Sequence, residues 1–189
     1  MKALSVLLRA IFGGVFIFSG FVKAVDPWGT AYKIEEYIAV FGMNWLTDAI
    51  SFLPITLSIL LSSLEFMIGV LIFFGFFPKL SKYSAAIIMG FFTILTFIDA
   101  LTNKVDDCGC FGDAIKLTNW ETFWKNVVLD VILVGIFLLE RKMELGVSRV
   151  NSKLLTSVFG VFIIAFSVYS AVYEPVIDFR AWKIGNQMV

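Results

Sequence analysis

The sequence predicts an all-α, polytopic membrane helix bundle: four core transmembrane helices, a fifth transmembrane helix and an outer interfacial amphipathic helix. Apolar types supply 59% of the 189 residues and charged types 16%, against about 45–50% and about 25% in globular domains. A soluble domain of this size buries only roughly two thirds of its surface, so the composition excludes a soluble monomer. The formal net charge is zero and there is no histidine, so nothing points to nucleic acid, a His-based triad or a His-ligated metal.

Five segments approach or exceed the roughly 20 apolar residues that a spanning helix needs. The first retains Arg9 inside its apolar run, which is unlike a cleaved signal peptide, and the second is opened by Pro54 and ended by Pro78. The fourth is short and carries the most polar residues. We therefore expect a transmembrane domain over 1–173 and an exoplasmic tail over 174–189, with spans at 4–22, 53–77, 83–101, 123–139 and 154–173.

The segment 28–50, between the first two spans, has a helical apolar stripe. Ile34, Tyr37, Ile38 and Phe41 follow the spacing i, i+3, i+4, i+7, and the neighbouring charged residues lie off that stripe. This pattern is typical of an amphipathic helix that lies in the membrane interface. Lysine and arginine are densest in the short loops on the side of the N-terminus, which predicts a cytoplasmic N-terminus and an exoplasmic C-terminus.

Both cysteines lie in the run Asp106–Asp113, as the Cys-x-Cys motif Cys108-Gly109-Cys110. A disulfide across one residue needs a tight turn, which Gly109 permits, and strained, exposed disulfides are the exchangeable ones. The neighbouring aspartates disfavour a thiolate unless Lys104 or Lys116 folds back over it. Two alternatives remain: a soft metal site, such as one for Cu(I), which no histidine can complete, and a simple loop staple or two unreactive thiols. A staple across so short a ring gains little loop-closure entropy.

Ionisable residues inside a span are expensive and therefore functional candidates. By the helical rise, Glu65 lies about 16 Å along its span from Pro54, and Asp130 lies about 15 Å from Glu140 at the inner face. These depths agree, so we expect the two carboxyl groups to face each other and share a proton. Arg9 would snorkel or reach towards either acid, and Asn126 shares a helix face with Asp130. Such a cluster is either a proton relay or quinone head-group pocket, or a structural network that fixes helix packing.

Two motifs carry a resemblance to a known family. The run Cys108-Gly109-Cys110-Phe111-Gly112 after the third span, and the first span with its exit, resemble the MauE branch of the DoxX-like membrane proteins over 4–139; the second motif reads Arg9…Gly13…Phe16…Ser19-Gly20…Lys23…Asp26-Pro27. DoxX relatives generally have four spans, and some are linked to quinone-coupled oxidation of sulfur compounds. MauE relatives are implicated in maturation of a disulfide-rich periplasmic dehydrogenase. Longer relatives continue past the tail into an exoplasmic domain, so we expect such a domain to be missing here or separately encoded.

The resemblance implies thiol or sulfur redox chemistry at the outer face of the bacterial inner (cytoplasmic) membrane. We expect Cys108 and Cys110 to be the catalytic pair, passing electrons between an exoplasmic thiol or thioredoxin-like protein and a membrane quinone. The expected quinone-binding residues are Glu65, Asn126, Asp130 and Arg9, and no metal site is expected. The alternative is a non-enzymatic assembly or scaffold protein for an exported partner. A transporter is disfavoured because the two halves show no matching broken helices.

Overall fold

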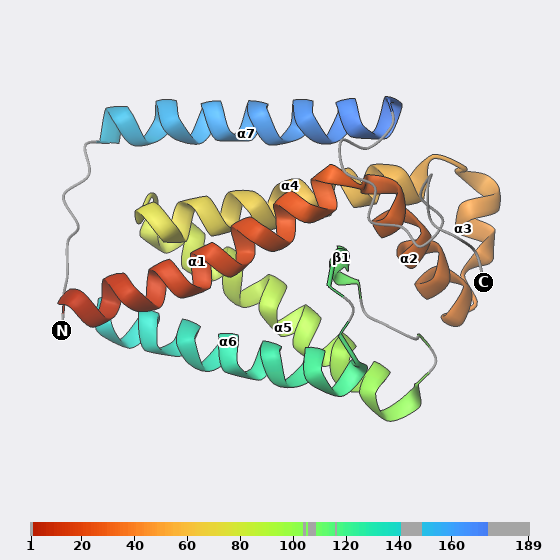
Figure 1. Cartoon of the computed structure of the whole chain (residues 1–189), viewed down its shortest axis with the longest axis horizontal. Helices are drawn as coiled ribbons and strands as arrows, with labels where there is room; N and C mark the ends of the chain where they lie inside the picture. Colours follow the sequence, from red (N-terminus) through yellow and green to blue (C-terminus); the bar gives the residue numbers. More distant parts are fainter. Residues whose placement is uncertain (1, 104, 106–108, 116, 141–148, 174–189) are drawn as a thin grey trace.

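The computed structural model describes residues 2–103, 105, 109–115, 117–140 and 149–173 (Figure 1). Five of its helices are long and apolar enough to cross a membrane, which confirms the predicted polytopic helix bundle. They are α1 (Lys2–Val25), α4 (Leu53–Phe74), α5 (Pro78–Thr102), α6 (Asn119–Glu140) and α7 (Arg149–Val172). The shorter elements are α2 (Pro27–Val40), α3 (Asn44–Ala49) and the strand β1 (Cys110–Asp113).

Helices α1 and α4 form the most closely packed pair, because glycines line their contact. A Cβ atom on Gly20 would lie 2.7 Å from the Ser62 carbonyl oxygen, and one on Gly69 would lie 2.6 Å from the Ile17 amide nitrogen. Both neighbours are backbone atoms, so any side chain would force the helices apart. Small residues permit this close approach in membrane helix pairs.

The main core lies between α1, α4, α5 and α6. Its buried members are Phe12, Phe16, Ile68, Ile72, Ala85, Met89, Leu129, Leu133 and Ile136. Helix α7 packs on α1 and α4 through Ile163, which contacts a second cluster with Ala24, Phe66 and Val70. Only 17% of the apolar window of α7 is buried, against 56% of that of α4, so α7 is peripheral to the four-helix core.

One end of the bundle carries α2, α3 and β1, and is called the capped end below (Figure 1). Asp26 begins α2 by accepting a hydrogen bond from the Gly29 amide at 3.2 Å, with Pro27 in the first turn, an arrangement that suits a helix N-terminus. The Trp28 indole donates to the Ala171 carbonyl at 2.9 Å and ties α2 to the end of α7.

The amphipathic segment differs from the single helix that the sequence predicts. It forms two helices, and the chain turns between them at Gly42, whose φ is +69°. Glycine adopts this left-handed conformation at least cost. Three residues of the predicted apolar stripe lie on α2, where Ile38 is buried. The fourth, Phe41, follows the helix and is 52% exposed.

Candidate functional site

A buried ion pair joins α1 to α4 beneath the capped end. Lys23 Nζ lies 2.6 Å and 2.7 Å from the two carboxylate oxygens of Glu65, and the two side chains are 4% and 3% exposed. Lys23 lies in the last turn of α1, while Glu65 lies at the middle of α4. An isolated charge in this apolar environment would be costly, and each of the two groups stabilises the charge of the other.

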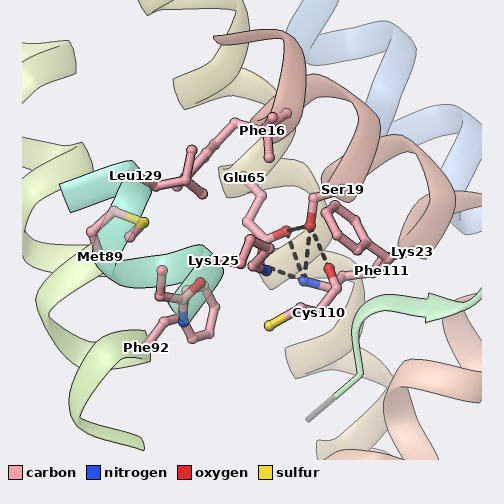
Figure 2. Close-up of a pocket in the computed structure, with 12 residues that line it drawn as sticks. Phe16, Ser19, Lys23, Glu65, Met89, Phe92, Cys110, Phe111, Lys125 and Leu129 are labelled. Atoms are coloured by element: carbon pink, nitrogen blue, oxygen red, sulfur yellow. Dashed lines mark hydrogen bonds and ion pairs between the residues drawn. The ribbon is translucent and has the colours of Figure 1, made fainter. Parts of the chain in front are cut away.

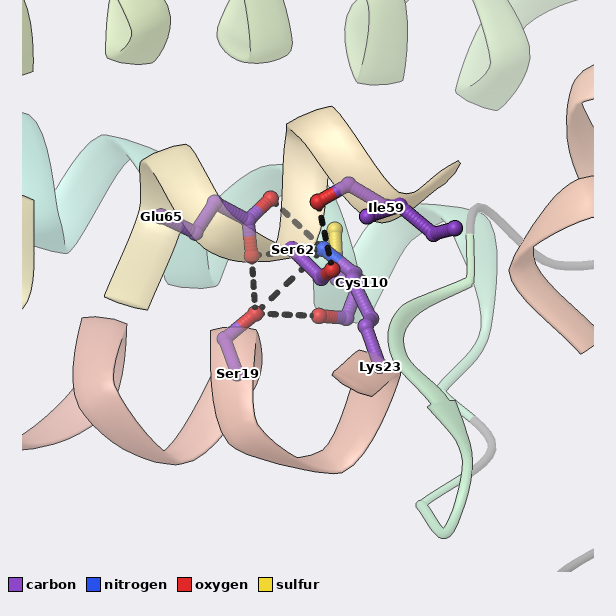
Figure 3. A network of polar contacts seen from close by, with 6 residues as sticks. All are labelled: Ser19, Lys23, Ile59, Ser62, Glu65 and Cys110. Carbon is purple, nitrogen blue, oxygen red and sulfur yellow. Dashed lines mark hydrogen bonds and ion pairs between the residues drawn. The ribbon is translucent and has the colours of Figure 1, made fainter. Parts of the chain in front are cut away.

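Ser19 connects this ion pair to the segment that carries Gly109 and Cys110, which is called the cysteine loop below (Figure 3). Its hydroxyl lies 2.8 Å from Glu65 Oε2 and also within hydrogen-bonding distance of the Cys110 carbonyl oxygen, while Lys23 Nζ donates to Ser19 Oγ at 3.4 Å. A hydroxyl carries one hydrogen, so it donates to the carboxylate or to the carbonyl, but not to both at once. The position of β1 is thereby linked to the ion pair.

The cysteine loop borders a small cavity of about 20 Å³ that is lined by both polar and apolar side chains (Figure 2), which is room for about one water molecule. Lys125 on α6 places its ammonium group 4.6 Å from the centre of the Phe111 ring, and Lys23 stands 5.6 Å from that of Phe92. These contacts are within cation–π range. The lining comprises Val15, Phe16, Ser19, Lys23, Glu65, Met89, Phe92, Cys110, Phe111, Lys125, Asn126 and Leu129.

A second cavity, of about 480 Å³, lies between α2, α5 and the cysteine loop. Its walls are largely apolar, with Ile34 and Ile38 from α2, Phe41 just after α2, and Phe91, Leu95 and Ile98 from α5. Three residues line both cavities, namely Lys23, Phe92 and Cys110. Cys110 therefore lies between the small cavity and the larger apolar cavity.

The structure describes part of the predicted catalytic motif. Cys110 begins β1 and is half-buried, whereas Cys108, Asp106 and Asp107 lie outside the described residues, as do Lys104 and Lys116. Gly109 has φ +57°, as the tight turn predicted for it requires, and its carbonyl accepts from the Gly112 amide at 3.0 Å. The lysines that share a cavity with Cys110 are Lys23, Lys33 and Lys125, so these cationic groups come from α1, α2 and α6.

The expected contact between Glu65 and Asp130 is not formed. Glu65 pairs with Lys23, and Asp130 Oδ2 accepts a hydrogen bond from Thr93 Oγ1 of α5 at 2.7 Å. Equal depth along two helices does not place two residues on facing sides. Asp130 is directed to α5 and Glu65 to α1, so this expectation was wrong.

Arg9 and Asn126 also have defined partners. Arg9 Nε donates to the Ile72 carbonyl at 2.8 Å and Nη2 to the Phe73 carbonyl at 3.2 Å, so Arg9 caps the C-terminus of α4, where cations are favoured. It does not approach either acid. Asn126 donates to Thr96 Oγ1 at 3.2 Å and lines the small cavity with Glu65. Of the four predicted quinone-binding residues, Glu65 and Asn126 alone share this cavity.

Sequence reasoning did not assign roles to Ser19 and Lys23. The first predicted span, 4–22, excludes Lys23, but α1 continues to Val25 and contains it. Their i, i+4 spacing places both on one helix face, which was an available signal. A further contact was also missed: Asp99 accepts a hydrogen bond from the Tyr37 hydroxyl at 2.6 Å. This bond connects α5 to α2.

The comparisons with known proteins bear on this part of the chain. A family model described as "Methylamine utilisation protein MauE" matches residues 1–139. The comparisons with curated proteins and with solved structures gave no match. The matched part runs from α1 nearly to the end of α6, so it contains the ion pair and the cysteine loop. The chain therefore belongs to the MauE family of membrane proteins.

Proposed function

We propose that the protein is a thiol–disulfide redox protein whose Cys108 and Cys110 exchange electrons with an exported thiol protein. The observation that carries the proposal is the position of Cys110, which shares a cavity with Lys23 and Lys125. Cysteines that take part in thiol–disulfide exchange are partly exposed, and Cys110 is half-buried where it lines both cavities. The hydrogen bond from the Ser19 hydroxyl to the Cys110 carbonyl holds the cysteine loop beside these two lysines.

In the oxidising direction, a thiolate of the partner attacks one sulfur of the Cys108–Cys110 disulfide and forms a mixed disulfide. The second partner thiolate then attacks the partner's sulfur in that bond. The partner leaves with a disulfide, and this chain keeps two thiols and the two electrons. A membrane quinone is the candidate for accepting those electrons, and the reverse reaction would reduce a partner instead.

The proposal includes a location and a partner class. The cysteine loop faces the exoplasmic side of a bacterial cytoplasmic membrane, where disulfides persist, with the N-terminus cytoplasmic and the C-terminus exoplasmic. The description of the family, methylamine utilisation, indicates the process in which the exported partner takes part. The partner is a disulfide-rich exported enzyme or a thioredoxin-like protein that acts on it.

Exchange with a purified dithiol protein tests this function. The oxidised chain in lipid nanodiscs would be mixed with a reduced thioredoxin-like protein, and mixed disulfides would be trapped with acid and resolved on a gel. The chain has only two cysteines, so Cys108→Ser and Cys110→Ser each leave one thiol and the double variant none. We expect the native chain to oxidise the dithiol and each single variant to fail. Equal oxidation by the double variant would contradict the proposal.

A scaffold for an exported partner is the second candidate, and the anchoring of the loop favours it. Asn119 Nδ2 donates to the Val105 carbonyl at 2.9 Å, and with the Ser19 contact this holds both sides of the described loop to the bundle. A scaffold would bind its partner equally well without thiols. Retention of partner binding and of partner maturation in the Cys108→Ser/Cys110→Ser variant would favour this candidate over the redox protein.

A further inference from the structure

We propose that the apolar cavity between α2 and α5 is a binding site for a membrane quinone, which enters from the lipid and takes electrons from the cysteine pair. The inference rests on the proposed redox function and adds a site to it. The sequence places a quinone among Arg9, Glu65, Asn126 and Asp130, inside the bundle. The structure points to a different place, outside the four-helix core and beneath α2.

The size and chemistry of the cavity define the ligand class. Its volume of about 480 Å³ falls within the range of about 300–1,000 Å³ for small-molecule sites. The few polar groups on its walls include the hydroxyl groups of Thr30, Tyr37 and Thr96, among a majority of aliphatic and aromatic side chains. A ligand that fits has a flat or branched apolar body and a small polar group. A strongly charged head group is disfavoured, because Lys23 is already paired with Glu65 and Lys33 with Glu36.

The position of the cavity gives a lipid-dissolved ligand access. Two of its α5 residues, Phe91 and Ile94, expose 61% and 65% of their surface, so the cavity adjoins the outer surface of the bundle. This surface belongs to a helix long and apolar enough to span a membrane, where exposed apolar side chains meet lipid tails. A molecule dissolved in the bilayer can therefore reach the cavity without crossing water.

The inner end of the cavity supplies the chemistry. Cys110 and Gly109 of the cysteine loop form part of its wall, together with Lys23. Among membrane-soluble molecules, a quinone is the class that accepts two electrons and two protons. In the step, the two thiols form one S–S bond, the quinone gains two O–H bonds, and no further oxidant is needed. A phospholipid tail would fill the same volume, but it offers nothing for a dithiol to reduce.

Binding is tested apart from redox turnover with the Cys108→Ser variant, whose only thiol is Cys110. The probe is a fully ring-substituted benzoquinone with a decyl tail, which cannot add to a thiol through a ring hydrogen position. In nanodiscs, the rate of Cys110 alkylation by a small maleimide would be measured with and without the probe. We expect the probe to slow alkylation at least fivefold. Decanol, which has the same tail length without the ring, should leave the rate unchanged.

A cavity-filling variant locates the effect. Leu95→Trp places a larger side chain on the cavity wall from a half-buried position. It should remove the protection, measured within this variant as the ratio of the alkylation rates without and with the probe. Ile164→Trp is the matched control, because Ile164 is 51% exposed on α7 and does not line the cavity. In this variant the probe should still protect Cys110 from alkylation.

The outcomes separate this inference from the proposed function. Equal protection by decanol, or protection that survives Leu95→Trp, would overturn the quinone site and indicate an ordinary lipid contact. A chain that exchanges disulfides with the dithiol protein but shows no protection would retain the redox function and lose the site. With two cysteines present, we also expect one hydroquinone to form for each Cys108–Cys110 pair oxidised.

Discussion

The Lys23–Glu65 ion pair should dominate the stability of the capped end. Lys23→Met leaves the Glu65 carboxylate buried without its cation, and Glu65→Gln leaves the ammonium group without its anion. With Nζ–O distances of 2.6 Å and 2.7 Å and side chains 4% and 3% exposed, each single variant should lose about 3–5 kcal/mol of unfolding free energy. The double variant Lys23→Met/Glu65→Gln buries no charge and should be within about 1 kcal/mol of the native chain.

The assay is equilibrium unfolding in mixed micelles of increasing sodium dodecyl sulfate content, followed by the fluorescence of the five tryptophans. The control is Lys33→Met/Glu36→Gln with its two single variants. That pair is 3.2 Å apart and its side chains are 25% and 37% exposed, so its removal should cost no more than about 1 kcal/mol. Purely additive effects at Lys23 and Glu65, or single-variant losses below about 1 kcal/mol, would refute the buried pair described here.

Three further substitutions, with Gly90→Ala as a control, test other contacts of α1. Gly20→Ala should cost about 1–3 kcal/mol in the same assay because the new Cβ meets the backbone of α4, whereas Gly90→Ala, with nothing within 4 Å, should be neutral or stabilise by about 0.5–1 kcal/mol. Arg9→Met should cost about 1.5–3 kcal/mol, since it removes a charged donor from the end of α4. Ser19→Ala removes the link to the Cys110 carbonyl and should increase the maleimide reactivity of Cys110 about two- to tenfold, by the loss of a hydrogen bond of about 0.5–1.5 kcal/mol; an unchanged rate would show that the loop is held elsewhere.

The spans could be predicted because composition and apolar run length determine them. The helix faces could not. Counting along the chain places Glu65 and Asp130 near the middle of α4 and α6, where the structure also has them. Position along a helix leaves its rotation open, so the partners of these two acids were assigned wrongly. Rotation is decided by close contacts such as that of Gly20 with α4, which only the folded packing shows.

The remaining differences have local causes. Arg9 was expected to snorkel or meet an acid, but the turn at Gly75, with φ +72°, brings the end of α4 to its guanidinium group. The turn at Gly42 divides the amphipathic segment, although the apolar stripe on its first half was identified correctly. The first span was predicted to end at residue 22 because the apolar run ends at Val22, whereas α1 continues to Val25 and includes Lys23.

The reduction potential of the Cys108–Cys110 pair in membranes tests the proposed function most directly. It is measured by trapping free thiols across a graded series of redox buffers and counting modified cysteines. Structural disulfides have potentials below about −300 mV, and exchangeable ones lie higher. We predict a single two-electron transition well above about −300 mV for the native chain. A transition below that value, or cysteines that never pair, would contradict a redox role for this loop.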